Sequence, residues 1–262
     1  MLSVIQFYTA KNYLDQNYPY YSGNYAAENP KPAAALTVVS YNIWFAENID
    51  QALSEIKEIN SQKELDIVLL QEMDETSVEQ IARELQLNYV YFPAAVEPTY
   101  DKNFGNAILS RWRMVGARKL ILPHKSLSNR MNRIATRATI KIHGADIFVY
   151  SVHTESVFTL PGFKKEQYTA VLDDIDPDAS LVIIGGDFNT FTEAAVEEIE
   201  EDYRRADLIR VSGESGYTFV KYGIEMSPDH IFAKGFVVEE TGTLAEATAS
   251  DHLPLWVALT LK

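Results

Sequence analysis

The feature that most constrains the fold is a run of five β-rich segments in the middle of the chain. They lie between residues 89 and 154, are joined by short connections, and read YVYFPA, GNAILSRW, ARKLILP, RIATRATIKI and ADIFVYSVHT. Short connections between successive strands favour antiparallel pairing. On both sides of this run, apolar strand-like segments alternate with amphipathic helical ones, such as NIDQALSEIKEIN. These patterns predict an α/β fold in which two packed sheets carry helices on their outer faces.

The first 35 residues differ in character from the rest of the chain. They hold six of the 15 tyrosines and end in the Pro- and Ala-rich stretch ENPKPAAA, which is typical of a linker. The spacing of their apolar residues favours a short helix over residues 2–14. We therefore interpret residues 1–35 as an N-terminal appendage and linker, and residues 36–262 as one domain.

Composition excludes several classes of protein. The chain has no cysteine, which rules out disulfides, zinc fingers, iron–sulfur clusters and a cysteine nucleophile. No apolar run approaches the ~20 residues of a membrane-spanning helix. The start, MLSVIQFYTAK, lacks a basic leader and is a poor secretory signal. We expect a soluble monomer without an obligate protein partner, either cytoplasmic or exported after removal of a leader.

Charge is distributed unevenly along the chain. The net charge is −14, yet residues 111–141 hold nine Lys or Arg and no Asp or Glu, so the remainder carries −23. Such a block is either a solvated face or an anion-binding surface on an acidic body. In the second interpretation, Lys125, Arg130 and Arg133 are candidate substrate-binding residues, because they flank the polar turn HKSLSN between two strand-like runs.

Polar side chains recur where apolar strands begin or end. Loops at strand ends can converge, so such residues can build one site at the rim of a sheet. Each residue alone is better explained as a helix cap, a turn residue or a buried core histidine. Their repetition favours a common site, and the residues concerned are Asn42, Glu72, His153, Asp187, Asn189, Asp229, Asp251 and His252.

The order of the motifs around these residues is informative. Along the chain they are SYNIW, LLQEMD, GNAILSRW, VHTES, GGDFNT, PDHIF and SDHLPLW. From about Leu36 to Lys262 this ordered set resembles the endonuclease/exonuclease/phosphatase superfamily of deoxyribonuclease-I-like phosphoesterases. The resemblance implies a four-layer α/β sandwich, with two packed mixed β-sheets flanked by helices. It also implies hydrolysis of phosphate esters with Mg²⁺ or Mn²⁺.

The resemblance also assigns roles to individual residues. Glu72 resembles the principal metal ligand, with Asn42 beside it and Asp251 on the far side of the metal site. Asp187 and Asn189 resemble the pair that handles the attacking water and a phosphate oxygen. His252 resembles the site histidine that Asp229 orients, and His153 resembles a phosphate-binding residue. Carboxylate and amide oxygens suit Mg²⁺, and a histidine held by an aspartate has a fixed tautomer.

The sequence thus favours a metal-dependent phosphodiesterase in which water attacks phosphorus directly, acting on a substrate that is a nucleic acid, a phospholipid or a small ester. A phosphomonoesterase of the inositol-phosphate type and an inactive binding module of the same fold remain alternatives. Retention of the carboxylates and of His252 speaks against the inactive module. Docking to a membrane through the tyrosine-rich N-terminus would need a further signal, because residues 1–14 carry little basic charge.

Overall fold

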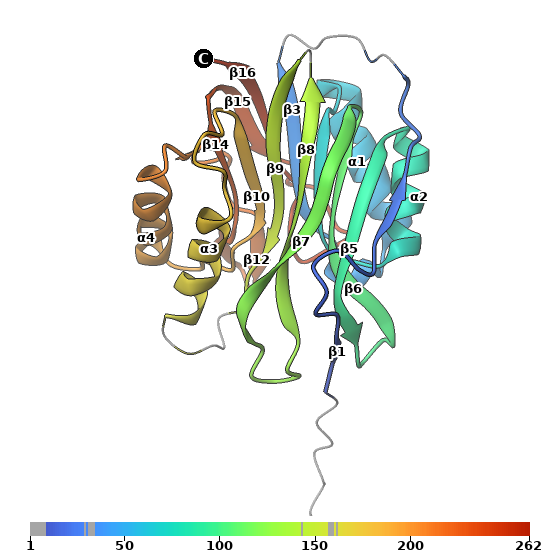
Figure 1. Ribbon diagram of the computed structural model, residues 1–262, viewed down its shortest axis with the longest axis vertical. Coiled ribbons are helices and arrows are strands. Elements are labelled where there is room, and N and C mark those ends of the chain that lie inside the picture. The colour runs from blue at the N-terminus through green and yellow to red at the C-terminus, as the bar shows by residue number, and fades with distance from the viewer. Residues whose placement is uncertain (1–8, 29, 31–34, 143, 157–159, 161) are drawn as a thin grey trace, which may run out of the picture.

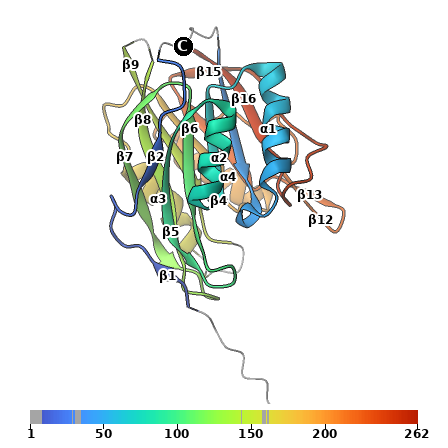
Figure 2. The ribbon, with the colours of Figure 1, turned by 90° about the vertical axis from the view of Figure 1, so that its right-hand side faces the viewer.

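Two β-sheets pack face to face, and helices cover the outer face of each (Figures 1 and 2). The computed structural model describes residues 9–28, 30, 35–142, 144–156, 160 and 162–262. The predicted four-layer sandwich, with two mixed sheets flanked by helices, is confirmed. Among the described residues, no helix combines the length and the apolar character needed to cross a lipid bilayer.

The first sheet has the strand order β1-β5-β6-β4-β3-β16-β15, with β2 also paired to β5. Only β3 and β4 run parallel among these described neighbours. The strands are β1 (Lys11–Asn12), β2 (Tyr21–Gly23), β3 (Leu36–Asn42), β4 (Ile67–Met73), β5 (Asn88–Glu97), β6 (Lys102–Ser110), β15 (Phe236–Thr243) and β16 (Leu255–Leu261).

The second sheet has the order β11-β14-β10-β9-β8-β7, and within it only β9 and β10 run parallel among the described strands. A separate two-stranded hairpin, β12–β13, projects from the body (Figure 2). The strands are β7 (Arg113–Lys125), β8 (Asn132–Ile142), β9 (Ala145–His153), β10 (Val182–Asp187), β11 (Ile209–Arg210), β12 (Phe219–Lys221), β13 (Ile224–Met226) and β14 (Asp229–Lys234).

Helices lie on the two outer faces, and two of them begin at a side-chain cap. They are η1 (Trp44–Ala46), α1 (Ile49–Lys63), α2 (Glu75–Leu85), α3 (Phe163–Asp173) and α4 (Glu193–Arg204). The side chain of Asp74 accepts a hydrogen bond from the Ser77 amide at the start of α2. At the start of α4, the side chain of Thr192 accepts one from the Ala195 amide. Such caps satisfy backbone donors that a helix leaves free.

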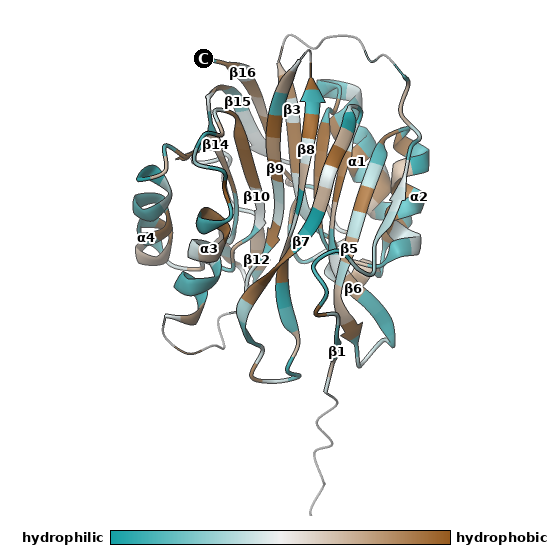
Figure 3. Cartoon of the chain, viewed as in Figure 1, coloured by the Kyte–Doolittle hydropathy of each residue, from teal (hydrophilic) through white to brown (hydrophobic). Residues whose placement is uncertain are grey.

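Apolar side chains form three large buried clusters between these elements. Figure 3 shows hydrophobic residues along the strands of both sheets. One cluster lies between α1, α2 and the first sheet and includes Ile56, Val78 and Tyr41. A second fills the space between the two sheets. A third packs α3 and α4 against the second sheet, through Tyr168 and Tyr203. Burial of apolar area on both faces of each sheet explains the nearly continuous apolar runs in the sequence.

The five central β-rich segments form β5 to β9, and their pairing is antiparallel as predicted. Strand β15 was not expected from the sequence. It is an edge strand, FVVEETGT, whose side chains beyond Phe236 are exposed or only half-buried, so it lacks an apolar alternation. Lys11 and Asn12 form β1, so the helix expected over residues 2–14 does not include them. Residues 2–8 lie outside the described part of the chain.

The segment assigned to an N-terminal appendage joins the body of the protein. Both β1 and β2 pair with β5. The Lys119 amide on β7 donates to the Gln16 carbonyl at 2.9 Å, and its fully buried ammonium donates to the carbonyls of Tyr18 and Pro93. Residues 11–23 therefore lie across β5 and β7, and Lys119 fixes them there.

Lys119 gives a stability prediction. Burial lowers the pKa of Lys119 to about 8 from its ordinary 10.5. Between pH 8 and pH 10.5 Lys119 is protonated more in the unfolded chain than in the folded one. The contribution of Lys119 to the free energy of unfolding therefore increases as pH rises through that window. Lys119→Met removes the titration. The difference in unfolding free energy between wild type and variant, measured by urea denaturation from about pH 8 to about pH 10, should therefore grow in favour of the wild type. A pH-independent difference would contradict this.

Candidate active site

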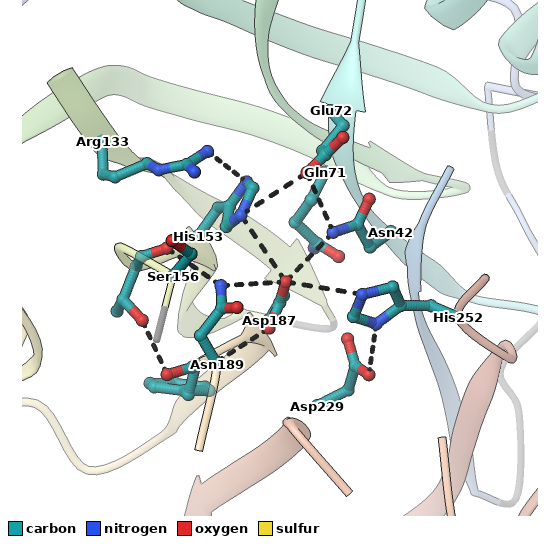
Figure 4. A network of polar contacts seen from close by, with 12 residues as sticks. Asn42, Gln71, Glu72, Arg133, His153, Ser156, Asp187, Asn189, Asp229 and His252 are labelled. Atoms are coloured by element: carbon teal, nitrogen blue, oxygen red, sulfur yellow. Dashed lines mark hydrogen bonds and ion pairs between the residues drawn. The ribbon is translucent and has the colours of Figure 1, made fainter. Parts of the chain in front are cut away.

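Strand register brings the polar residues at the strand ends together. The parallel pair β9–β10 places His153 opposite Asp187, and the antiparallel pair β10–β14 places Asp187 opposite Asp229. In the first sheet, the parallel pair β3–β4 ends with Asn42 opposite Gln71, the residue before Glu72. Because the two sheets face each other, the ends of β3, β4, β9 and β10 form one rim (Figure 4).

Gly186 allows this register next to Asp187. Its φ is +150°, and a Cβ at this position would lie 1.9 Å from the carbonyl oxygen of Val152 on β9. Any other residue would therefore force β9 and β10 apart. The glycine is required because the neighbouring backbone approaches too closely for a side chain.

Glu72 projects from an irregular point of β4. The β4–β6 register shifts between Leu70 and Met73, and Glu72 has a φ of +61°, which is uncommon for a residue with a side chain. Its Oε2 accepts from the Phe45 amide at 3.2 Å, and its Oε1 lies 3.4 Å from the amide Nδ2 of Asn42. Burial raises the pKa of Glu72, although the charges of Arg133 and His252 oppose the rise. The bulge thus directs a buried carboxylate into the site.

Asp187 lies at the centre of the network (Figure 4). Its Oδ1 accepts a hydrogen bond from the backbone amide of Asn189 at 2.8 Å. Its Oδ2 accepts from the side-chain amides of Asn42 and Asn189, each at 3.1 Å. The Asn189 side chain also donates to the Thr154 carbonyl, so both of its amide hydrogens are used. Burial raises the pKa of Asp187 to about 7, with His252 opposing. Asn189 therefore holds a carboxylate that can exchange a proton near neutral pH.

His252 is held by Asp229 on the other side of Asp187. Its Nδ1 donates to Asp229 Oδ2 at 2.8 Å, and the same oxygen accepts from the Thr218 hydroxyl at 2.6 Å. The His252 Nε2 lies 3.8 Å from Asp187 Oδ2. Burial alone would lower the pKa of His252, but the charges of Asp229 and Asp187 outweigh burial and raise it. The imidazole is therefore protonated, with its Nε2–H facing the centre of the site.

His153 carries the opposite protonation state. Its Nδ1 lies 3.4 Å from Arg133 Nη1, and because a guanidinium can only donate, Nδ1 must accept. The remaining hydrogen is then on Nε2, which lies 3.5 Å from Asp187 Oδ2 and 3.7 Å from Glu72 Oε1. Burial, with the charges of Arg133 and His252, lowers the pKa of His153 well below its ordinary value. A neutral histidine thus presents a donor to the site.

The donor set fits a divalent cation. The Oδ1 of Asn42 is buried and has no hydrogen-bond partner among the described residues, which is a costly arrangement unless a ligand completes it. The Glu72 carboxylate beside it supplies a charged oxygen, and hard cations such as Mg²⁺ prefer oxygen ligands. Asp187, Asp229 and His252 also bring ligand atoms within 4.8 Å of one another. Asp251 is exposed and lies outside that group, although its charge acts on His252.

The nine cations of the basic stretch do not form one surface. Four of them pair with acidic residues away from the site, namely Arg111, Arg118, Arg137 and Lys141. Lys119 is buried and Arg113 is exposed. Arg133 enters the site, where its guanidinium lies 3.5 Å from the Glu155 carboxylate. Lys125 and Arg130 form no ion pair with any described residue, and they line a hollow of about 590 Å³ with Leu127 and Phe163. The three residues predicted as one substrate-binding group therefore occupy two places.

Several residues of the site gave no signal in the sequence. Lys164, in the first turn of α3, donates to the Asn189 carbonyl at 2.6 Å, and burial lowers its pKa. Thr218 supports Asp229, and the Phe104 ring lies 5.8 Å from the His153 ring. None follows an apolar strand or belongs to a motif, so only the folded chain identifies them.

Solved structures share this architecture. An endonuclease/exonuclease/phosphatase family protein from Leptotrichia buccalis aligns with a TM-score of 0.71 at 20% identity, over 87% of this chain and 100% of that one. A mannosyl-6-phosphatase from Bacteroides thetaiotaomicron aligns with a TM-score of 0.66 at 20% identity, over 86% of this chain and 100% of that one. At such identity the likeness concerns the fold alone.

Sequence comparison gives the family. A UPF0294 protein from Vibrio cholerae is 30% identical over 123 residues, which are 45% of this chain and 41% of that protein's length. The chain thus aligns with less than half of this curated relative. The model of the Endonuclease/Exonuclease/phosphatase family matches residues 39–252, from β3 to His252. The chain therefore belongs to the endonuclease/exonuclease/phosphatase family.

Proposed function

We propose that this protein is a divalent-metal-dependent phosphodiesterase in which water attacks the phosphorus directly. The observation that supports the proposal is the convergence of Glu72, Asn42, Asp187, His153 and the Asp229–His252 pair on one rim. The described residues around this site include no serine or cysteine arranged as a nucleophile with an adjacent base.

The residues of the chain divide the chemistry among them. Asp187, with a pKa raised by burial, is placed to take a proton from the attacking water. The Nε2–H groups of His153 and His252 point toward the same centre and are placed to donate to the nonbridging phosphate oxygens, where negative charge increases in the transition state. Asp229 keeps His252 protonated and oriented.

Glu72 and the free Oδ1 of Asn42 would hold the metal ion. A bound Mg²⁺ or Mn²⁺ supplies positive charge beside the phosphate. The carboxylates of Glu72, Asp187 and Asp229 face the cations of Arg133 and His252 across the site.

An activity panel tests the proposal. Purified protein is assayed with Mg²⁺, with Mn²⁺ and with EDTA against bis-p-nitrophenyl phosphate, p-nitrophenyl phosphate, plasmid DNA, RNA and sphingomyelin. We expect EDTA-sensitive cleavage of at least one diester. Faster cleavage of the monoester would show a phosphomonoesterase. Inactivity on every substrate, together with phosphate binding, would support an inactive binding module.

The separation of Arg133 from Lys125 and Arg130 gives a prediction on substrate size. Neutralising Lys125 and Arg130 together should raise KM for a large anionic substrate and flatten its salt dependence, because fewer counterions are released on binding. Turnover of bis-p-nitrophenyl phosphate should stay the same. Arg133→Ala should instead lower small-ester turnover by about tenfold or more, since it removes a charge beside the site.

Initial rates at low and high salt measure both effects. Unchanged rates in the Lys125/Arg130 variant on every substrate would show that these two residues belong to a solvated face. Full small-ester turnover in Arg133→Ala would exclude Arg133 from the site.

A further inference from the structure

The short strand β1 joins both sheets at the end where the active site lies. Through β5 it belongs to the first sheet, with Asn12 opposite Ala95. Through three further hydrogen bonds it contacts the turn between β7 and β8 of the second sheet. The Ala10 amide donates to the Asn129 carbonyl at 2.8 Å. The Asn12 side chain donates to the Arg130 carbonyl at 2.9 Å and accepts from the Asn132 amide at 2.7 Å. In Figure 1, β1 and this turn lie at the same end of the molecule.

The turn itself has few pairing contacts with β7. The β7–β8 register shifts between Ile121 and Lys125, and the last pair before the turn is Lys125 with Asn132. Arg130 has a φ of +59°, which is unfavourable for a residue with a side chain. The turn is closed by hydrogen bonds of its own, from the Ser126 amide to the Met131 carbonyl at 2.9 Å and from the Arg130 amide to the Ser126 carbonyl at 3.1 Å. The side chain of Asn12 adds one contact on each side of Met131 and so ties this turn to β1.

Packing couples the same contact to the active site. Met131 packs in a buried cluster with Ala10, Ala95 and Phe104. The Phe104 ring lies 5.5 Å from the Arg133 guanidinium and 5.8 Å from the His153 ring. Arg133 follows Asn132 directly, and its contacts to His153 and Glu155, at 3.4 and 3.5 Å, are too long to fix it alone. On its other side, Arg133 is followed by Ile134, which pairs with Ile121 and His153. Asn132, which Asn12 holds, is therefore the second of the two backbone anchors that place Arg133.

We propose that Asn12 is a positioning residue of the active site, which acts through Asn132 on Arg133. The inference rests on the proposed function in one respect, namely that Arg133 interacts with the phosphate. The N-terminal segment is then a part of the site and not a separate appendage. Its contribution is to help hold the Arg133 guanidinium beside His153.

Hydrogen exchange tests the contact without any assay of activity. Asn12→Ala removes the acceptor of the Asn132 amide, so exchange at residues 126–132 should accelerate by about tenfold, in line with the loss of a hydrogen bond. Asn12→Asp keeps the acceptor and loses the donor, and should give an intermediate rate. Asn17→Ala is the matched control, because Asn17 lies exposed in the same segment. Equal exchange in all four proteins would overturn the proposal.

A double-mutant cycle tests the action through Arg133. In the wild-type background, Asn12→Ala should lower kcat/KM for bis-p-nitrophenyl phosphate by about tenfold and by no more than Arg133→Ala does, since small displacements of binding groups are costly. In an Arg133→Ala background the same change should have no further effect. An equal loss in both backgrounds would show that Asn12 acts on general stability, and would overturn the proposal.

The positioning role of Asn12 can be tested separately from the proposed hydrolase activity. If the wild-type protein cleaves no ester, titration with inorganic phosphate by calorimetry replaces turnover in the same cycle. Weaker phosphate binding in Asn12→Ala, absent in the Arg133→Ala background, would keep the positioning role while the hydrolase assignment falls. Unchanged phosphate binding in Asn12→Ala would reject the positioning role.

Discussion

Replacing Glu72 with alanine is expected to abolish metal-dependent turnover while the fold persists. The carboxylate is largely buried, accepts a hydrogen bond from the Phe45 amide and lies beside the Oδ1 of Asn42, which has no partner among the described residues. A cation held there stabilises transition-state charge by several kcal/mol, so its loss should lower kcat/KM by about three orders of magnitude or more. Rates measured across a titration of Mg²⁺ and of Mn²⁺ give this loss directly.

Stability should change little in this variant. Glu72 is a rim residue with a left-handed backbone, and alanine meets the same backbone constraint. A thermal melt followed by circular dichroism checks this point. Glu58→Ala, an exposed acid on α1, is the control for the loss of one negative charge. A Glu72→Ala protein that keeps full Mg²⁺-dependent turnover would show that the metal is held elsewhere, for which Asp187, Asp229 and His252 are the next candidates.

Asp229 and His252 are expected to act as one unit, although 23 positions separate them. Removal of one preorganised donor to transition-state charge typically costs about 10²–10³-fold in rate, so Asp229→Ala and His252→Ala should each lose on that order. The double variant should lose little more, because paired catalytic residues are strongly non-additive. Steady-state rates of the three variants and the wild type complete the cycle.

A titration of the His252 ring provides a second measurement for the same pair. The charge of Asp229 contributes to raising the pKa of His252, so Asp229→Ala should lower that pKa. His252 would then lose its proton as pH rises at a lower pH than in the wild type. Imidazole proton resonances followed against pH detect this change. Multiplicative rate losses together with an unchanged His252 titration would show that the two residues act independently.

Much of the fold was predictable from local pattern. The apolar runs around Val68, Ile108 and Ile183 become buried strands, and their alternation with amphipathic helices predicts two covered sheets. Strand β15 was missed because its exposed edge position removes the apolar signal on which such a prediction depends. The N-terminal segment was separated from the domain for a related reason, since its short strands are held by hydrogen bonds to β5 and not by an apolar face of their own.

By itself, the sequence determined which polar residues lie at the ends of strands, because an apolar run and the residue that ends it are adjacent in the chain. It could not determine which strand ends meet. Asn42 donates to Asp187 across 145 positions, and that contact depends on the pairing and packing of both sheets. Tertiary structure alone separated Arg133 from Lys125 and Arg130, and it alone placed Asn12 beside Asn132. Hydrophobic periodicity fixes the face on which a side chain lies, whereas register and neighbours follow from hydrogen bonds between distant segments.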